Sequence, residues 1–126
     1  MTGKILVVDD SALSRRTIRR ILESENLTVL ESSDGLTAME TFFLEKPDVV
    51  LLDLVMTGMY GLDVLAKLKE MDPKVRVIIV SADIQSSTRK LAEEAGAFAI
   101  LHKPVAASDL LAALRDLLSG GSLGTQ

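Results

Sequence analysis

Four separate places in the sequence carry side chains that could do chemistry together. Two are acidic, the pair Asp9-Asp10 and the single Asp53, and the others are the hydroxyl of Ser81 and the ammonium of Lys103. Three carboxylates at one point repel one another, so such a group needs a cation or raised pKa values. Oxygen ligands suit a hard cation such as Mg²⁺, which keeps water positions that phosphate oxygens can take. The set therefore predicts a site for phosphoryl chemistry.

Each member of this set has a role that phosphoryl chemistry needs. Asp53 is the candidate nucleophile, because a carboxylate that attacks a phosphoryl group forms an acyl phosphate. Lys103 supplies a point charge that pairs with phosphate, and Ser81 supplies a hydroxyl that donates to a phosphoryl oxygen. Taken singly, these residues are more often helix caps, loop hydroxyls and surface cations. We expect His102, the one histidine, to have a surface or structural role rather than to bind metal.

The reason to group these residues is that each follows a short apolar segment typical of a buried strand. Aliphatic, β-branched runs of this kind occur in strands that are buried on both faces of a parallel sheet. The carboxyl ends of parallel strands share one edge, where open α/β sheets bind ligands. The four segments are 4–8, 49–52, 75–80 and 98–101, and a weaker strand, 27–30, ends near Glu31 and Ser32 without a comparable group.

Helical segments alternate with these strands. Periodicity and breaking residues predict helices near 13–22, 36–44, 62–71, 89–95 and 106–118. Ser11 and the turn Ser33-Asp34-Gly35 supply caps for the first two helices. Five strands alternating with five helices predict an α/β fold: a doubly wound (βα)5 chain with a five-stranded parallel sheet and helices on both faces.

The first predicted helix has two contrasting sides. A helical projection places one apolar half opposite one basic half, and we expect the apolar half to pack and the basic half to be exposed. The apolar half holds Leu13, Thr17, Ile18, Ile21 and Leu22, and the basic half holds Arg15, Arg16, Arg19 and Arg20.

Composition narrows the classes of protein to consider. The chain has 126 residues, 48% of them hydrophobic, which suits one globular domain. Its net charge of -4 argues against direct binding of nucleic acid. Lack of cysteine fits a reducing compartment, and no apolar run spans a membrane, so we expect a cytoplasmic protein. We place the domain at 1–118 and interpret 119–126 as a flexible tail or truncated linker.

Asp9-Asp10, Asp53, Ser81 and Lys103-Pro104 in this alternation resemble the receiver domain of two-component response regulators, especially the single-domain, chemotaxis-regulator-like type. The resemblance covers about residues 4–118. It implies a flavodoxin-like strand order of 2-1-3-4-5. It also implies a phosphorylation-dependent signalling switch that assists its own phosphorylation and dephosphorylation but is not an enzyme.

The resemblance assigns a role to each site residue. Asp53 would accept a phosphoryl group from the phosphohistidine of a sensor histidine kinase or a histidine phosphotransfer protein. Mg²⁺ would be held by Asp10, Asp53 and the backbone carbonyl of Val55, with Asp9 acting mainly through water. Lys103 would contact the phosphoryl group.

The resemblance also implies how the switch works. The bond from Lys103 to Pro104 would be cis, and Ser81 would swing in to bind the phosphorylated state. The surface of the fourth helix, fifth strand and fifth helix would then rearrange for a downstream effector protein. The basic first helix would dock the phosphodonor, and we expect the chain to be a monomer.

Four positions depart from the usual receiver pattern. Ile100 stands where an aromatic switch residue is usual, so the readout would run through Ser81 and the backbone. Thr57 replaces a usual proline and Tyr60 a usual aspartate, which predicts a less rigid loop. Val55, two residues after Asp53, offers no side chain to an attacking water.

Two alternatives to the switch remain open. The departures at Ile100, Thr57 and Tyr60 suit an interaction module that keeps the fold but works without phosphorylation. A haloacid-dehalogenase-like aspartyl-phosphate phosphatase also uses an aspartate at a strand end. That family expects a second acid two residues later, where this chain has Val55.

Overall fold

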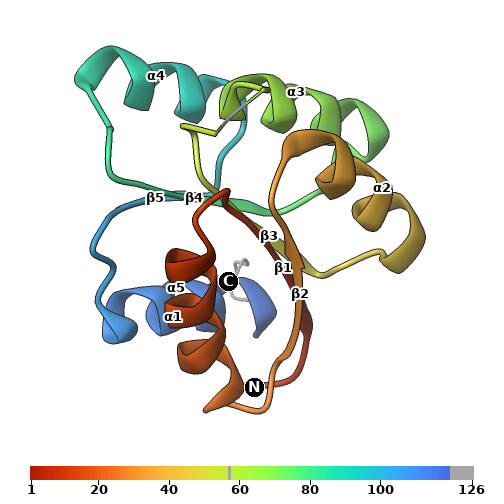
Figure 1. Ribbon diagram of the computed structural model, residues 1–126, viewed down its shortest axis with the longest axis vertical. Helices are drawn as coiled ribbons and strands as arrows, with labels where there is room; N and C mark the ends of the chain where they lie inside the picture. The colour runs from red at the N-terminus through yellow and green to blue at the C-terminus, as the bar shows by residue number, and fades with distance from the viewer. Residues whose placement is uncertain (57, 120–126) are drawn as a thin grey trace.

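Five parallel strands form one sheet in the computed structural model, which describes residues 1–56 and 58–119. The spatial order is β2-β1-β3-β4-β5, as the resemblance implied (Figure 1). Each neighbouring pair is parallel. Thr57 and the predicted tail beyond Ser119 lie outside the described residues. The strands are β1 (Lys4–Val8), β2 (Thr28–Ser32), β3 (Val49–Leu52), β4 (Val77–Ser81) and β5 (Ala99–His102).

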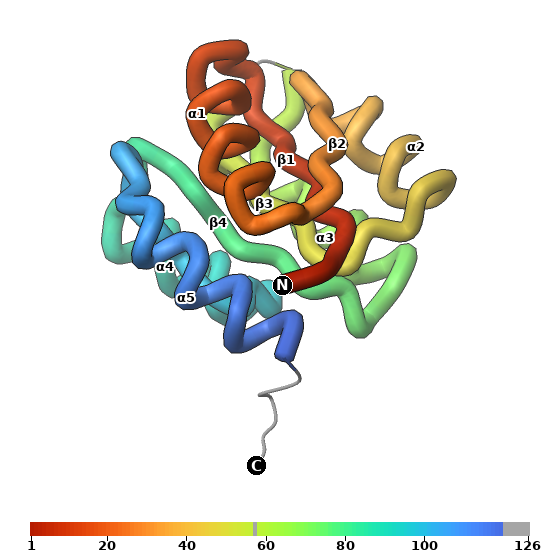
Figure 2. Tube along the Cα trace, turned by 90° about the horizontal axis from the view of Figure 1, so that it is seen from below, coloured from red at the N-terminus to blue at the C-terminus, as the bar shows by residue number. Residues whose placement is uncertain are grey.

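Helices cover both faces of this sheet. In Figure 1, α2, α3 and α4 lie on one side of the strands, while α1 and α5 lie on the other. Figure 2 shows α1 and α5 from their own side, in front of the strands. The doubly wound arrangement that the alternation predicted is therefore confirmed. The helices are α1 (Ala12–Glu23), α2 (Gly35–Glu45), α3 (Gly61–Met71), α4 (Ser86–Glu94) and α5 (Ala107–Leu118).

Each face of the sheet has its own hydrophobic core. Alternate residues of the strands point to opposite faces, so Leu52 packs with the cluster under α2 and α3, and Leu51 packs with the cluster under α1 and α5. All four residues of β3 are buried, as predicted for a central strand. Burial on both faces fixes the point at which β3 ends, and thereby the position of Asp53.

The strand pairing continues just beyond the carboxyl ends of the strands. The Asp53 N–H donates to the Val8 carbonyl at 3.0 Å, and the Asp9 N–H donates to the Ser32 carbonyl at 3.1 Å. Beyond the paired strands β4 and β5, the Lys103 N–H donates to the Ser81 carbonyl at 3.0 Å. These bonds extend the hydrogen-bond pattern of the sheet to the backbone of the candidate site residues.

Several element boundaries differ from the prediction for local reasons. Val75 was predicted to open β4, but its N–H donates to the Asp72 carbonyl in a turn, and the strand begins at Val77. The serines and threonine of 86–88 were predicted to precede α4, but they form its first turn. The predicted cap of α2 is present: the Asp34 side chain accepts from the Thr37 N–H at 2.8 Å.

The expected division of α1 into a packed and a basic half is partly wrong. Ile18 and Leu22 are buried, but Leu13 is 70% exposed. Arg15 and Arg19 do not lie free in solvent, because both bind Glu31 of β2, at 2.9 and 2.6 Å. A helical projection considers the helix alone. In the folded chain, the neighbouring edge strand supplies Glu31, and both arginines form ion pairs with it.

The Glu31 cluster predicts a pH dependence of stability. The hydrogen bond from Arg19 holds the pKa of Glu31 below its ordinary value of 4.5, although burial opposes this. A depressed folded-state pKa stabilises the fold above that value, and this contribution is lost as the pH falls through the folded pKa. The midpoint of thermal unfolding should therefore fall more steeply below pH 4.5 in the wild type than in Glu31→Gln.

The control for this measurement is Glu70→Gln, at an exposed position of α3. It should keep the steep dependence of the wild type, because it leaves Glu31 and its two arginines in place. A Glu31→Gln variant whose unfolding midpoint follows the wild-type pH curve would show that the cluster does not stabilise the fold.

No helix among residues 1–56 and 58–119 combines the length and hydropathy that crossing a membrane requires.

Candidate functional site

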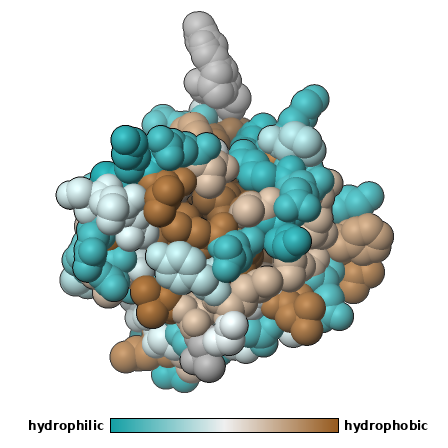
Figure 3. Space-filling view, turned by 90° about the horizontal axis from the view of Figure 1, so that it is seen from above, coloured by the Kyte–Doolittle hydropathy of each residue, from teal (hydrophilic) through white to brown (hydrophobic). Residues whose placement is uncertain are grey.

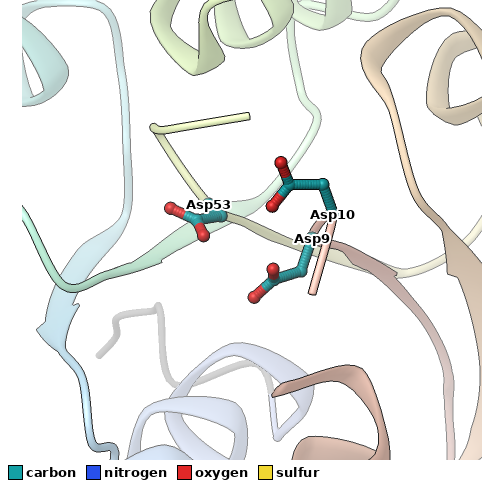
Figure 4. A group of neighbouring side chains, drawn as sticks. All are labelled: Asp9, Asp10 and Asp53. Carbon is teal, nitrogen blue, oxygen red and sulfur yellow. The ribbon is translucent and has the colours of Figure 1, made fainter. Parts of the chain in front are cut away.

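The three predicted carboxylates meet at the carboxyl ends of β1 and β3. Asp9, Asp10 and Asp53 each offer one oxygen, and these oxygens lie within 4.8 Å of one another. Figure 4 shows the side chains of Asp9 and Asp10 pointing to opposite sides of the end of β1, with Asp53 beside them at the end of β3. Asp9 and Asp53 are buried, and Asp10 is exposed. Such a cluster of negative charge requires a compensating cation.

Lys103 supplies a positive charge to this cluster. Its Nζ donates to Asp9 Oδ2 at 2.5 Å and to Asp53 Oδ2 at 2.9 Å, and it donates to Ser14 Oγ at 3.3 Å. Burial tends to lower the pKa of Lys103, but the hydrogen bonds to Asp9 and Asp53 outweigh it and leave that pKa raised. The ammonium therefore stays charged and bridges two carboxylates that few water molecules reach.

Asp53 accepts from three donors, which come from three different segments of the chain. Oδ1 accepts from the Val55 N–H at 3.0 Å and from the Ser81 hydroxyl at 2.9 Å, and Oδ2 accepts from Lys103. Ser81 is completely buried. Its hydroxyl already contacts Asp53 in the unmodified chain, and the swing of Ser81 on phosphorylation stays a prediction. The four strand ends named from the sequence are thus brought together.

The β1–α1 connection is held by a chain of hydrogen bonds that begins at Asp9. Asp9 Oδ1 accepts from the Ser11 N–H at 2.8 Å, and Ser11 Oγ caps α1 by accepting from the Ser14 N–H at 3.2 Å. The Arg15 guanidinium donates to the Asp9 carbonyl at 2.5 Å. One side chain of the acid pair therefore fixes the start of α1.

Sequence reasoning missed the part that Ser14, Arg15 and Glu31 play at this site. The edge strand β2 was predicted to contribute no comparable group, yet Glu31 near its end holds Arg15, which holds the Asp9 carbonyl. Ser14 lies three residues after the predicted cap Ser11, and that spacing is the signal that could have placed it at the start of the helix.

The backbone at the start of α3 lies very close to the backbone just after β3. A Cβ on Gly61 would lie 2.4 Å from Leu54 Cα and 2.6 Å from the carbonyl oxygen of Asp53. The Gly61 N–H also donates to the Leu54 carbonyl at 2.9 Å. Val55 is 53% exposed, so its side chain is not aimed into the site while its N–H binds Asp53. Gly61 thus allows the close turn that follows the candidate nucleophile.

The remaining predicted positions lie around this centre. The Lys103–Pro104 bond is cis, as expected, and His102 is exposed. Ile100 is half-buried and packs against the cluster under α2 and α3.

Figure 3 views the molecule from the side of α3 and α4, where hydrophobic side chains gather between hydrophilic ones. Tyr60 precedes α3 and is 47% exposed.

Comparison with known proteins finds similar sequences and similar structures. The sequence matches the family described as the response regulator receiver domain over residues 5–115. It is 31% identical to the sporulation initiation phosphotransferase F of Bacillus subtilis over 118 residues, covering 94% of this chain and 95% of that protein.

Solved structures have the same fold over nearly the whole chain. A CheY-like receiver domain protein from Methanospirillum hungatei superposes with a TM-score of 0.90 at 25% identity, covering 97% of this chain and 98% of that one. A chain of the CheX–CheY–BeF3–Mg²⁺ complex from Borrelia burgdorferi gives 0.87 at 27% identity, covering 91% and 88%.

Other relatives are longer than this chain. It is 36% identical to the response regulator MprA of Mycobacterium ulcerans over 118 residues, which are 94% of this chain but 51% of that protein. The chain therefore spans about half the length of this relative.

Proposed function

The chain belongs to the receiver domain family of response regulators, which are phosphorylation-dependent signalling switches, and we propose that Asp53 is its phospho-acceptor. The observation that carries this proposal is the set of donors around Asp53. The Val55 N–H, the Ser81 hydroxyl and the Lys103 ammonium all reach this one carboxylate. Positioned donors and charge neutralisation are what phosphoryl transfer depends on.

The proposed reaction transfers a phosphoryl group between two protein side chains. A carboxylate oxygen of Asp53 attacks phosphorus, a P–O bond forms, and the bond from phosphorus to the donor nitrogen breaks. The donor imidazole leaves with the electron pair and takes up a proton. Lys103 and Ser81 are placed to bind oxygens of the transferred group, because both already contact the attacking carboxylate.

The donor set of the site fits a magnesium ion. Three carboxylates each offer an oxygen within 4.8 Å of the others, and neither cysteine nor histidine takes part. We propose that Asp10, Asp53 and the backbone carbonyl of Val55 bind the metal, and that Asp9 acts mainly through water because its Oδ2 binds Lys103. Bound Mg²⁺ would neutralise charge on the phosphoryl oxygens.

Magnesium should therefore stabilise the fold. A ligand that binds only the folded state contributes about 2.7 kcal/mol when its free concentration is about 100 times its dissociation constant. The thermal unfolding midpoint should rise on replacing EDTA with Mg²⁺ in the wild type, and this rise should shrink in Asp10→Asn. Asp63→Asn, an exposed acid on α3, should keep the full rise. An equal rise in both variants would contradict the assignment of Asp10.

The proposed partners follow from this chemistry. The phosphodonor would be a sensor histidine kinase or a histidine phosphotransfer protein, and the phosphorylated chain would bind a downstream effector. We also propose that the chain works in the cytoplasm, together with these partners. We propose a signalling domain rather than an enzyme with a separate substrate, since Val55 stands where an aspartyl phosphatase would have its second acid.

Incubation with acetyl phosphate and Mg²⁺ tests the proposal. The intact mass of the chain should increase by one phosphoryl group, and the increase should disappear when EDTA replaces Mg²⁺. A chain that remains unmodified under these conditions would favour the alternative of an interaction module that works without phosphorylation.

A further inference from the structure

We propose that Ser14 is a positioning residue for phosphoryl transfer, and that its hydroxyl holds the ammonium of Lys103 over the acidic cluster. The inference rests on the proposed function of Asp53 and adds a residue to it. The observation behind it is the hydrogen bond from Lys103 Nζ to Ser14 Oγ at 3.3 Å, which joins α1 to the end of β5 across 89 residues of sequence.

The Ser14 hydroxyl completes the surroundings of the ammonium. A lysine ammonium has three N–H donors, and Lys103 has three acceptors within reach: Asp9 Oδ2, Asp53 Oδ2 and Ser14 Oγ. The three acceptors come from the end of β1, the end of β3 and the first turn of α1. Three directions fix the ammonium more narrowly than two would, because two acceptors leave it free to turn about the line that joins them.

The start of α1 leaves the Ser14 hydroxyl available for this role. Ser11 is the cap, so Ser14 is the third helical residue, and its N–H is held by Ser11 Oγ at 3.2 Å. In a capping box, the third residue turns its side chain back to the N–H of the cap residue. Here Asp9 Oδ1 already accepts from the Ser11 N–H at 2.8 Å. Asp9 therefore makes the hydrogen bond to the cap N–H that the third residue makes in a capping box. The hydroxyl of Ser14 is left to accept from Lys103 instead.

The space beside Lys103 explains why its position needs a further contact. A cavity of about 340 Å³ separates α1 from the segment after β5, and Ser14, Thr17, Lys103 and Pro104 are among the residues that line it. A flexible four-carbon stem beside open space has many rotamers available. A neutral hydroxyl restricts them without adding a charge that would compete with phosphate for the ammonium.

The hydroxyl would matter most during transfer. When Asp53 becomes an acyl phosphate, it loses its carboxylate charge, and the ammonium must bind a phosphoryl oxygen instead. Asp9 and Ser14 belong to the β1–α1 connection, which takes no part in bond formation. They can therefore keep their contacts with Lys103 before and after the transfer.

Removing the hydroxyl should slow phosphorylation. We expect Ser14→Ala to lower the rate of Asp53 phosphorylation by acetyl phosphate with Mg²⁺ by about fivefold, the effect of losing one hydrogen bond. Ser14→Thr, which keeps a hydroxyl, should restore the rate. Thr17→Ala is the matched control, because Thr17 lines the same cavity but its hydroxyl donates to the Leu13 carbonyl at 3.0 Å. It should react at the wild-type rate.

A double-mutant cycle separates positioning of Lys103 from a general effect on the fold. If Ser14 acts through Lys103, then Ser14→Ala should cause no further loss of rate in a Lys103→Ala background. The inference is overturned if Ser14→Ala reacts as fast as the wild type, if Ser14→Thr is as slow as Ser14→Ala, or if the fivefold loss persists without Lys103. A wild-type chain that takes up no phosphoryl group would instead overturn the proposed function.

Discussion

Replacing Asp53 with Asn is expected to abolish phosphorylation by acetyl phosphate completely, so that the intact mass of the variant stays unchanged where the wild type gains one phosphoryl group. The amide nitrogen and oxygen of Asn are poor nucleophiles, and the neutral side chain removes one of three carboxylates from the proposed metal site. The fold should persist, since removal of one negative charge relieves repulsion in the cluster.

The matched control is Asp48→Asn, just before the opposite end of the same strand. Asp48 precedes β3 and its Oδ2 accepts from the Lys4 N–H at 2.7 Å, far along the strand from the site. This variant should be phosphorylated like the wild type. Full phosphorylation of Asp53→Asn would show that another side chain is the acceptor, and peptide mapping of the modified chain would identify it.

Gly61→Ala is expected to destabilise the fold by about 3 kcal/mol, which is the upper end of the usual range for overpacking. The added methyl group would lie 2.4 Å from Leu54 Cα and 2.6 Å from the Asp53 carbonyl oxygen, and both are backbone atoms that cannot turn away. Helix propensity alone would predict a gain of about 1 kcal/mol for this change at the start of α3. Chemical denaturation at constant pH measures the sign and size of the effect.

Gly58→Ala is the informative comparison for Gly61→Ala. Gly58 has a φ of +93° but open space around its Cβ position, so the substitution costs backbone strain without a steric clash. We expect a smaller loss, of about 1 kcal/mol. If Gly61→Ala proved as stable as the wild type, the close approach of α3 to the backbone of Asp53 would not be needed for folding.

Much of the sheet and of the central site is predictable from sequence, because buried parallel strands leave a clear signal. The run Val49–Leu52 has only aliphatic residues and stops at an acid, so its end is visible without knowledge of its neighbours. The same reasoning places Ser81 and Lys103 at strand ends. The sheet then brings these ends together for any sequence with this order of elements.

Sequence reasoning could not predict the contacts that depend on the orientation of each helix about its own axis when it packs on the sheet. The orientation of α1 places Leu13 in solvent and brings Arg15 and Arg19 to Glu31 on a strand that is adjacent in space. The contact of Ser14 with Lys103 depends on the packing of α1 beside the segment after β5. Neither follows from the periodicity of a single helix.

The contact between Lys103 and Asp9 joins residues that lie 94 positions apart in the chain. During synthesis, Asp9, Asp10 and Asp53 leave the ribosome long before Lys103 does. Until then the sheet has no lysine at its acidic edge and no β5 to complete it. The site is therefore completed only after β5 has been made, and a nascent chain that stops before Lys103 lacks the ammonium that bridges Asp9 and Asp53.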